Sequence, residues 1–364
     1  MERETAVVLA NDAFTTPSAK TAHGLVRGPS RYDVLAVVDA SVAGSDAGEL
    51  LDGRHRAVPV VASMQDVLRL WEPGRDASHS RPHRCVVGIA PSGGHLPATL
   101  RRDLITAAEA GVGLVSGLHT SLAHDAEIAA AAKRGGAEIL DVRRPAKPER
   151  LAHWSGEIVR VRTPRIAVLG TDCCIGKRTT ATWLVQGLCD AGVRTELVST
   201  GQTGWLQGAS YGFFLDATPN DFVSGELERV VLACSREAEP DLIVLEGQSS
   251  FFNPSGPCGA EFILSAGARA VILQVAPGRV FHDDLEDAEV QIAPAEKHVA
   301  MAELLGARVI ACTMNGEGLS EAEALAACES LQRTLGLPVI RPREQGVGTL
   351  VEIVRQYVVS DTGR

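Results

Sequence analysis

Short apolar runs alternate with longer amphipathic stretches along the first 140 residues. The apolar runs have the length and β-branched content of buried strands, which we expect at residues 34–38, 58–61, 85–89, 113–115 and 138–140. Between the last three, residues 98–110 and 124–134 are rich in alanine, glutamate and arginine and are long enough for crossover helices. This alternation predicts parallel βαβ units in a doubly wound, Rossmann-like sheet.

The pattern is interrupted at residues 143–148, where two prolines and clustered charge indicate a solvated connector. We place the boundary between Val142 and Pro164. Beyond it, strands are expected at 166–169, 196–199, 242–245, 270–274, 308–312 and 339–340, with a helix over 321–335. The sequence therefore predicts an α/β protein with an N-terminal Rossmann-like domain (1–144), a linker (145–164) and a larger α/β domain (165–364).

Length, charge and cysteine content narrow the class of protein. The 364 residues are 45% apolar, enough for two cores. The formal net charge of -10 argues against nucleic acid and anionic membranes as partners, because both require basic surface. No apolar run approaches the roughly 20 residues of a membrane span, so we expect a cytoplasmic protein. We also expect a small molecule as its ligand and a homo-oligomeric state. The eight cysteines form no C-x-x-C pair, which predicts reduced thiols and no structural zinc.

Residues 165–180 have the order of a phosphate-binding loop, or P-loop: an apolar strand, a glycine-bounded loop and a helix. Glycines let successive backbone N–H groups point inward, the helix directs its positive end to the same place, and a lysine adds a full charge. The expected ligand is a pyrophosphate. The residues predicted to hold it are Gly170, Thr171, Asp172, Cys173, Cys174, Ile175, Gly176, Lys177, Arg178 and Thr179.

This loop departs from the commonest P-loop in two ways. Five residues instead of four separate Gly170 from Gly176, and Arg178 stands where a Ser or Thr hydroxyl usually ligates Mg²⁺. Thr179 or Thr180 could replace that hydroxyl, so the sequence leaves the metal site open. The alternative is an ordinary glycine-containing turn between a strand and a helix.

A second polar cluster follows the strand expected at 242–245. Glu246 and Gln248 should face the same space as the P-loop, because ligands bind at the carboxyl ends of parallel strands. Glu246 could bind a cation, orient a nucleophile or accept a proton. Alternatively, it caps a helix or pairs with an arginine.

Other polar residues also follow expected strands. Gln202 and Thr203 lie in a glycine-containing loop after residue 199, and Arg279 and His282 follow the strand that ends at 274. Asp221 is either a site residue or the N-cap of a helix that begins near Phe222. In the N-terminal domain, His95 and His119 follow glycines; tight turns explain these segments equally well.

Taken together, the order of several motifs resembles the family long catalogued as domain of unknown function sixteen-eleven. The motifs are Ser116-Gly117-Leu118-His119, Asp141-Val142-Arg143, Gly170-Thr171-Asp172-Cys173, Gly176-Lys177-Arg178-Thr179-Thr180, Gly201-Gln202-Thr203-Gly204, Asp221-Phe222-Val223, Glu246-Gly247-Gln248 and Pro277-Gly278-Arg279. The resemblance implies a Rossmann-like N-terminal domain and a P-loop NTPase-like C-terminal domain similar to dethiobiotin synthetase. Some members of that family are D-glutamate N-acetyltransferases. Where the family often has a His-Pro pair, this chain has Asn253-Pro254.

The leading hypothesis is an acetyl-CoA-dependent N-acetyltransferase that acts on an amino acid, with D-glutamate as the first candidate. The P-loop would hold the CoA pyrophosphate without a metal, and Arg279 would pair with an acceptor carboxylate. Backbone N–H groups near Gly201 or Gly247 would stabilise the oxyanion. The candidate bases are Glu246 and Asp221, followed by His282; the candidate substrate-binding residues are Gln202, Thr203, Gln248, Arg279 and His119.

Competing hypotheses remain at this stage. The main alternative is ATP with Mg²⁺ in a ligase or kinase of the dethiobiotin synthetase type, and another is a non-catalytic nucleotide-binding regulatory protein. Cys173 or Cys174 could carry an acetyl group in a covalent route, although direct transfer needs no such step. A nicotinamide dehydrogenase is disfavoured because no G-x-G-x-x-G follows the first strand.

Overall fold

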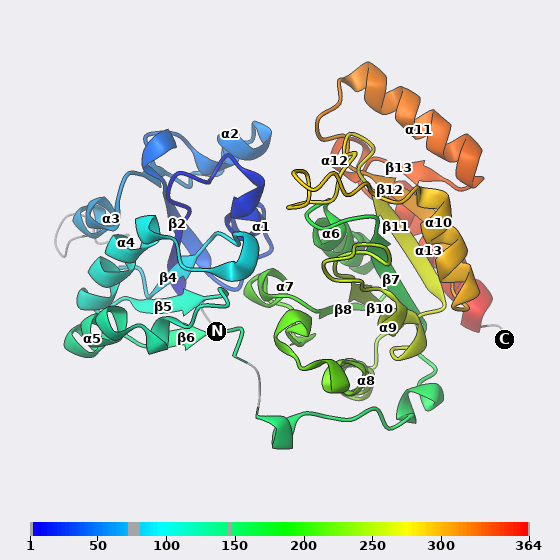
Figure 1. The fold of residues 1–364 in the computed structure, drawn as a ribbon, viewed down its shortest axis with the longest axis horizontal. Helices are drawn as coiled ribbons and strands as arrows, with labels where there is room; N and C mark the ends of the chain where they lie inside the picture. Colours follow the sequence, from blue (N-terminus) through cyan, green and yellow to red (C-terminus); the bar gives the residue numbers. More distant parts are fainter. Residues whose placement is uncertain (1–2, 72–80, 145–146, 363–364) are drawn as a thin grey trace. The chain divides into compact units, whose positions relative to one another are not determined.

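The computed structural model describes residues 3–71, 81–144 and 147–362 (Figure 1). The chain divides into two compact units. The first contains Met1–Pro145 together with Gln202–Gly208, and the second contains Ala146–Gly201 together with Ala209–Arg364. A short segment of the C-terminal half therefore belongs to the N-terminal unit.

The first unit is built on a six-stranded parallel sheet with the order β3-β2-β1-β4-β5-β6. Its strands are β1 (Thr5–Leu9), β2 (Asp33–Val38), β3 (Val60–Val61), β4 (Arg84–Val87), β5 (Gly113–Ser116) and β6 (Ile139–Asp141). Its helices are α1 (Lys20–Arg27), α2 (Ala47–Asp52), α3 (Met64–Leu70), α4 (Ala98–Glu109) and α5 (Ala126–Gly135). This strand order is the Rossmann order, so the predicted fold is confirmed. The sequence-based prediction missed the central strand β1.

The second unit carries a seven-stranded parallel sheet with the order β13-β12-β11-β7-β10-β8-β9. Its strands are β7 (Arg165–Gly170), β8 (Thr195–Ser199), β9 (Tyr211–Gly212), β10 (Leu242–Glu246), β11 (Ala270–Val275), β12 (Arg308–Met314) and β13 (Val339–Ile340). Its helices are α6 (Lys177–Asp190), α8 (Asn220–Glu237), α9 (Ala260–Leu264), α10 (Ala295–Leu304), α11 (Glu321–Leu335), α12 (Pro342–Gln345) and α13 (Gly348–Thr362). The predicted P-loop α/β fold is confirmed as well.

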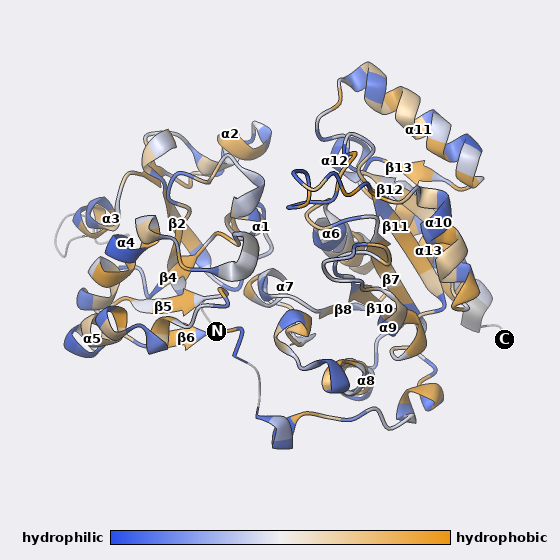
Figure 2. Cartoon of the chain, in the orientation of Figure 1, coloured by the Kyte–Doolittle hydropathy of each residue, from blue (hydrophilic) through white to orange (hydrophobic). Residues whose placement is uncertain are grey.

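Two apolar cores hold β7 in the middle of this second sheet. Alternate β7 side chains face opposite sides of the sheet, as the two-residue period of a strand requires. Ile166 and Val168 pack with α6 and α13, whereas Ala167 and Leu169 pack with α8, α9, α10 and α11. Figure 2 shows the strands as apolar and the outer helix faces as mixed or polar. Because β7 is buried on both faces, the loop at its carboxyl end starts from a rigid base.

The short helix α7 (Gln202–Leu206) lies in the first unit, although the strands on either side of it in sequence, β8 and β9, belong to the second. Arg31 fixes it there: its backbone N–H donates to Leu206 (2.9 Å), and its guanidinium lies 4.2 Å from the centre of the Trp205 ring. Gln207 adds a 3.0 Å hydrogen bond to the carbonyl of Gly24 in α1. The chain between β8 and β9 therefore crosses to the first unit and returns.

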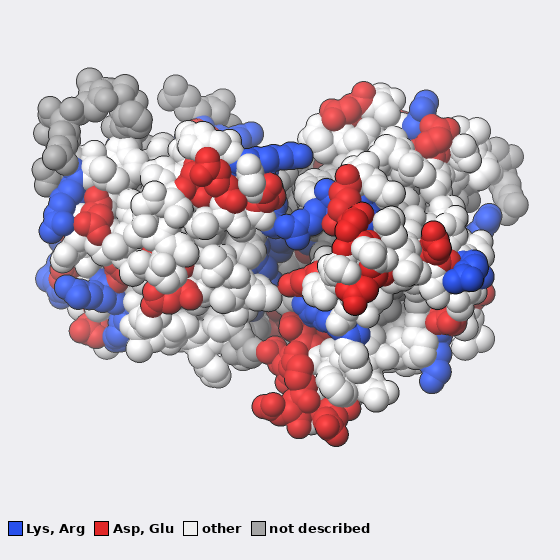
Figure 3. Space-filling model, turned by 90° about the horizontal axis from the view of Figure 1, so that it is seen from above, with Lys and Arg blue, Asp and Glu red and all other residues white. Residues whose placement is uncertain are grey.

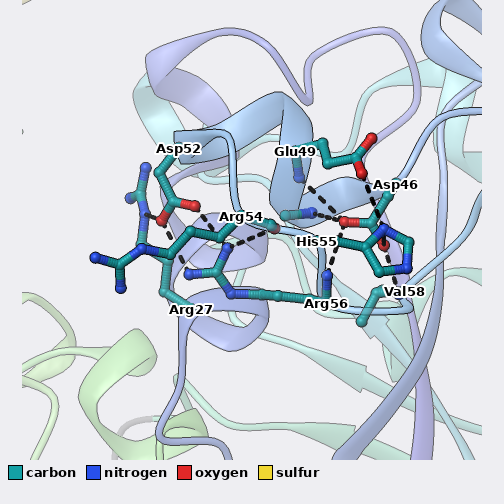
Figure 4. A network of polar contacts seen from close by, with 9 residues as sticks. Arg27, Asp46, Glu49, Asp52, Arg54, His55, Arg56 and Val58 are labelled. Carbon is teal, nitrogen blue, oxygen red and sulfur yellow. Dashed lines mark hydrogen bonds and ion pairs between the residues drawn. The ribbon is translucent and has the colours of Figure 1, made fainter.

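Within the first unit, the carboxylate of Asp46 organises α2 and the segment that follows it (Figure 4). It accepts four backbone hydrogen bonds of 2.8–3.1 Å, from the N–H groups of Gly48, Glu49, Arg56 and Val58. Burial raises the pKa of this carboxyl, but the four donors outweigh burial and hold its pKa below the usual value. Asp46 therefore closes the loop from residue 46 to residue 58 through its negative charge.

The surface shows both signs of charge. On the face drawn in Figure 3, red acidic clusters and blue basic side chains lie among uncharged residues. Across the described parts of the chain, no helix has the length and apolar character needed to span a membrane.

Candidate functional site

The P-loop connects β7 to α6, as predicted. β7 ends at Gly170, the loop runs through residues 171–176, and α6 begins at Lys177. A Cβ added to Gly170 would lie 2.9 Å from both the Ile175 and Lys177 side chains and 3.1 Å from the Gln274 carbonyl oxygen, so these groups would have to shift to admit another residue. Gly176, with φ of 104°, adopts the left-handed conformation at the helix start.

Backbone N–H groups are available where α6 begins. Gly176 caps the helix and offers no side chain to its first turn. Among the residues that the structure describes, no protein atom accepts a hydrogen bond from the N–H groups of Ile175, Gly176 or Lys177. Free amides at the positive end of a helix favour an anion. The geometry suits a phosphate group.

The Lys177 side chain crosses the P-loop. It is 6% exposed, and its ammonium donates to the backbone carbonyls of Asp172 and Ser249, the latter at 2.9 Å. Burial lowers the pKa of this ammonium, while nearby thiols and the Asp172 carboxylate counteract that effect. An ammonium has three donors, so one N–H remains beyond these two bonds.

The Asp172 side chain holds the loop to the segment between β11 and α10. It is fully buried, and it accepts hydrogen bonds from His282 Nδ1 (2.8 Å) and from the backbone N–H of Asp283 (2.9 Å). Arg279 Nη1 (3.3 Å) and Asn253 Nδ2 (3.5 Å) complete its surroundings. The sequence placed Asp172 among the phosphate contacts; in the structure, its carboxylate braces the loop.

Glu246 ends β10, next to β7 in the sheet. Its side chain is 4% exposed and accepts a 3.2 Å hydrogen bond from the Thr200 N–H, while Gln248 donates to the Thr200 hydroxyl at 3.0 Å. Burial raises the pKa of Glu246, and the positive charge of Arg178 opposes that rise. The ends of β8 and β10 therefore bring Thr200, Glu246 and Gln248 together, with Glu246 within electrostatic reach of the P-loop cations.

Two family models cover most of the chain. One, described as a domain of unknown function with a P-loop (DUF1611, C-terminal), matches residues 152–351; the other, its Rossmann-like N-terminal partner, matches residues 40–145. The chain belongs to the DUF1611 family.

Relatives within and near this family agree with that assignment. A protein of Tritonibacter scottomollicae named D-glutamate N-acetyltransferase is 32% identical over 273 residues, covering 73% of this chain and 79% of its own length. A Pseudoalteromonas protein with the same name is 29% identical, with the same coverage of both chains. A crystal structure of a DUF1611 protein from Anabaena variabilis aligns with a TM-score of 0.84 and 29% identity, over 97% of this chain and all of that one.

Several predicted substrate contacts of this DUF1611 chain lie in the first unit. Thr203 bonds the hydroxyl of Thr21 at 2.8 Å, and Gln202 packs against Gly117. His119 is exposed in the same unit. Gln202 and Thr203 are therefore built into the N-terminal unit as part of α7.

Asp221 lies in the first turn of a helix and is not its N-cap. The helix α8 begins at Asn220 with Pro219 as its N-cap, so Asp221 is an exposed residue of the first turn. The prediction that Asp221 caps a helix starting near Phe222 is therefore wrong. Pro219 precedes this start with a non-helical ψ of 140°, and it has no backbone N–H that needs a partner.

Other predicted contacts are already engaged within the second unit. Arg279 Nη1 donates to Asp172 and to the carbonyl of Cys173 (3.0 Å), so an acceptor carboxylate would compete with these groups. Thr180, one candidate for the missing Mg²⁺ ligand, donates to Gln274 at 2.7 Å. The N–H of Gly247 donates to the Val168 carbonyl (3.1 Å), which rules it out as an oxyanion donor in this conformation.

Sequence reasoning missed His298. It is fully buried on α10, with its ring 4.8 Å from Phe252 and 6.1 Å from Phe251. Within the described structure, neither ring nitrogen makes a hydrogen bond, and the Ala293 backbone offsets only part of the effect of burial on the pKa. Burial lowers the pKa of His298 to about 4. A single histidine in a helical stretch gives no sequence signal for such an environment.

Metal binding was left open by the sequence. Over the residues described, no group of three or more His, Cys, Asp or Glu side chains is arranged to hold a metal ion.

Proposed function

We propose that this protein transfers the acetyl group of acetyl-CoA to the amino group of an amino acid, with D-glutamate as the preferred acceptor. The observation that carries the proposal is the set of unpaired N–H groups at Ile175, Gly176 and Lys177, beside the Lys177 ammonium. Two relatives that carry the name D-glutamate N-acetyltransferase, 29% and 32% identical, support the choice of reaction.

The P-loop suits the pyrophosphate of CoA. Three amides and one ammonium can donate to its oxygens, and charge-assisted bonds of this kind are about twice as strong as neutral ones. Arg178 replaces the hydroxyl that usually ligates Mg²⁺, and Thr180 is bonded to Gln274. A diphosphate held by amides and lysine requires no metal, which favours CoA over Mg-ATP.

The chemistry requires a base, because an ammonium group has no lone pair with which to attack a thioester. A side chain that takes this proton contributes about 10²- to 10⁴-fold to the rate. Of the three candidates predicted from sequence, Glu246 and His282 lie in the surroundings of the P-loop, whereas Asp221 is exposed on α8. Glu246 accepts a hydrogen bond from the Thr200 N–H, and the positive charge of Arg178 attracts its carboxylate.

A substrate panel tests the reaction. The protein is incubated with acetyl-CoA, or separately with ATP and Mg²⁺, together with the D and L forms of glutamate, aspartate, glutamine and alanine, and products are identified by mass. We expect N-acetyl-D-glutamate from acetyl-CoA alone, unchanged by EDTA. Product that requires ATP and Mg²⁺ would establish the ligase or kinase alternative. Cofactor binding without product from any amino acid would favour a regulatory protein.

A further inference from the structure

A fully buried histidine stands next to the P-loop with one ring nitrogen unused. His282 Nδ1 lies 2.8 Å from Asp172 Oδ1, and both residues are completely buried. In the parts of the chain that the structure describes, Nε2 of His282 has no hydrogen-bond partner. Buried polar atoms almost always have partners, so this nitrogen calls for an explanation.

The hydrogen bond to Asp172 determines which nitrogen carries the proton. When Asp172 is ionised, its carboxylate only accepts hydrogen bonds, and Nδ1 of His282 is then the donor. The neutral ring then has its lone pair on Nε2, the arrangement that a general base needs. Three further donors, from Arg279, Asn253 and the Asp283 backbone, fix the Asp172 carboxylate. They hold the imidazole in one orientation.

We propose that His282 is the general base of the acetyl transfer and that Asp172 is its positioning residue. The inference rests on the proposed function and assigns a base within it. Glu246, in contrast, shares its carboxylate with the Thr200 N–H and lies in the field of Arg178. Burial raises the pKa of Glu246, so this carboxyl is also able to take up a proton, but it already accepts a hydrogen bond, whereas Nε2 of His282 has no partner in the described structure.

The step balances as follows. His282 Nε2 takes one proton from the acceptor ammonium, and the freed lone pair of the amine attacks the thioester carbonyl carbon, forming the C–N bond. Collapse of the tetrahedral adduct breaks the C–S bond. The departing thiolate takes the second amine proton and leaves as CoA thiol, and the imidazolium returns its proton to solvent. The products are the N-acetyl amino acid, CoA and one proton.

Access to Nε2 requires movement of the segment after β10. Asn253 is buried against Asp172, and the rings of Phe251 and Phe252 lie near His298. Because His282 has no solvent contact, the acceptor reaches it only when neighbouring residues move, and residues 251–253 are the segment that we infer to move.

His282→Asn separates the catalytic role from the structural one. The asparagine amide can still donate to Asp172, as Nδ1 does, but nothing replaces the Nε2 lone pair. We expect kcat to fall by about 10²- to 10⁴-fold, with the dissociation constant of acetyl-CoA within about twofold of wild type and an unchanged thermal midpoint. The exposed His153→Asn is the matched control, with full activity expected.

Asp172→Asn provides a second test should His282→Asn fail to fold. An amide that donates to Nδ1 would move the ring proton to Nε2, so kcat should fall while the change in acetyl-CoA affinity stays smaller. Unchanged kcat in His282→Asn would overturn this inference alone. Absence of any N-acetylated product from wild type would overturn the proposed function, and this inference with it.

Discussion

The ammonium of Lys177 donates a 2.9 Å hydrogen bond to the backbone carbonyl of Ser249. This bond links the start of α6 to the segment after β10, and Ser249 has a φ of 32°, which is uncommon for a residue other than glycine. A phosphate that binds Lys177 would compete with this carbonyl. We infer that the P-loop and residues 249–253 respond together when a phosphate enters.

The tight start of the P-loop gives a first prediction. In Gly170→Ala, the new methyl group meets the side chains of Ile175 and Lys177 at 2.9 Å, so the Lys177 side chain must shift from the position in which its ammonium crosses the loop. CoA affinity, measured by calorimetry, should fall about tenfold or more, equivalent to about 1.4 kcal/mol. Gly256→Ala is the control, because its methyl group meets no atom within 4 Å. Equal affinities of the two variants would contradict the assignment.

The docking of α7 gives a second prediction. A Cβ added to Gly117 would overlap the side-chain amide of Gln202, so Gly117→Ala should destabilise the protein in urea unfolding. Gln202→Ala removes the amide that the methyl group meets. The double variant should therefore lose less free energy of unfolding than the sum of the single variants, with a coupling of about 0.5–3 kcal/mol. Strict additivity would show that the two residues are not in contact.

Two features of the second unit, the helix over 321–335 and the P-loop, show how much of the structure local sequence patterns predict. The helix predicted over 321–335 is observed as α11 with the same ends, and the structure shows why they are sharp: Ser320 and Glu323 form a capping box at its start, and Gly336 ends it in the left-handed conformation. The P-loop was predicted because a strand, its glycines and a lysine follow one another directly in the chain.

Long-range packing accounts for what the sequence did not reveal. The central strand β1 is only five residues long, and its burial comes from β2 and β4 on either side. Asp172 meets His282 from 110 positions away. The placement of α7 in the first unit likewise depends on Arg31, far earlier in the chain. None of these partners leaves a local pattern.

Asp46 gives a third prediction, on stability. Asp46→Asn removes the charge that four backbone N–H groups share, so the free energy of unfolding at pH 7 should fall by about 1–3 kcal/mol. The folded pKa of Asp46 is depressed, so its contribution is complete above the ordinary value of 3.8 and is lost as pH falls through the folded pKa. The difference from wild type should therefore shrink in strong acid. Exposed Asp33→Asn should show little effect at either pH.

His298 gives a fourth prediction, which concerns a buried basic group instead of an acidic one. Its pKa is about 4 in the folded protein against an ordinary 6.5, so the unfolded chain binds a proton first as pH falls from 6.5 towards 4. Wild type should lose up to about 3 kcal/mol over that range from this residue. His298→Phe should lose less stability between pH 7.5 and pH 4.5, measured by urea unfolding. An identical loss in both proteins would show that His298 is accessible to protons when folded.

The pyrophosphate assignment is tested most directly by removing the pyrophosphate from the ligand. The dissociation constants of acetyl-CoA and S-acetylpantetheine, which lacks the diphosphate, are measured in EDTA for wild type, Lys177→Ala and the exposed-lysine control Lys133→Ala. We expect wild type and Lys133→Ala to prefer acetyl-CoA by at least about 100-fold and Lys177→Ala to lose about 10-fold or more of that preference, because each charge-assisted bond contributes about 1.5–3 kcal/mol. Equal affinity of wild type for the two ligands, or an undiminished preference in Lys177→Ala, would contradict the account.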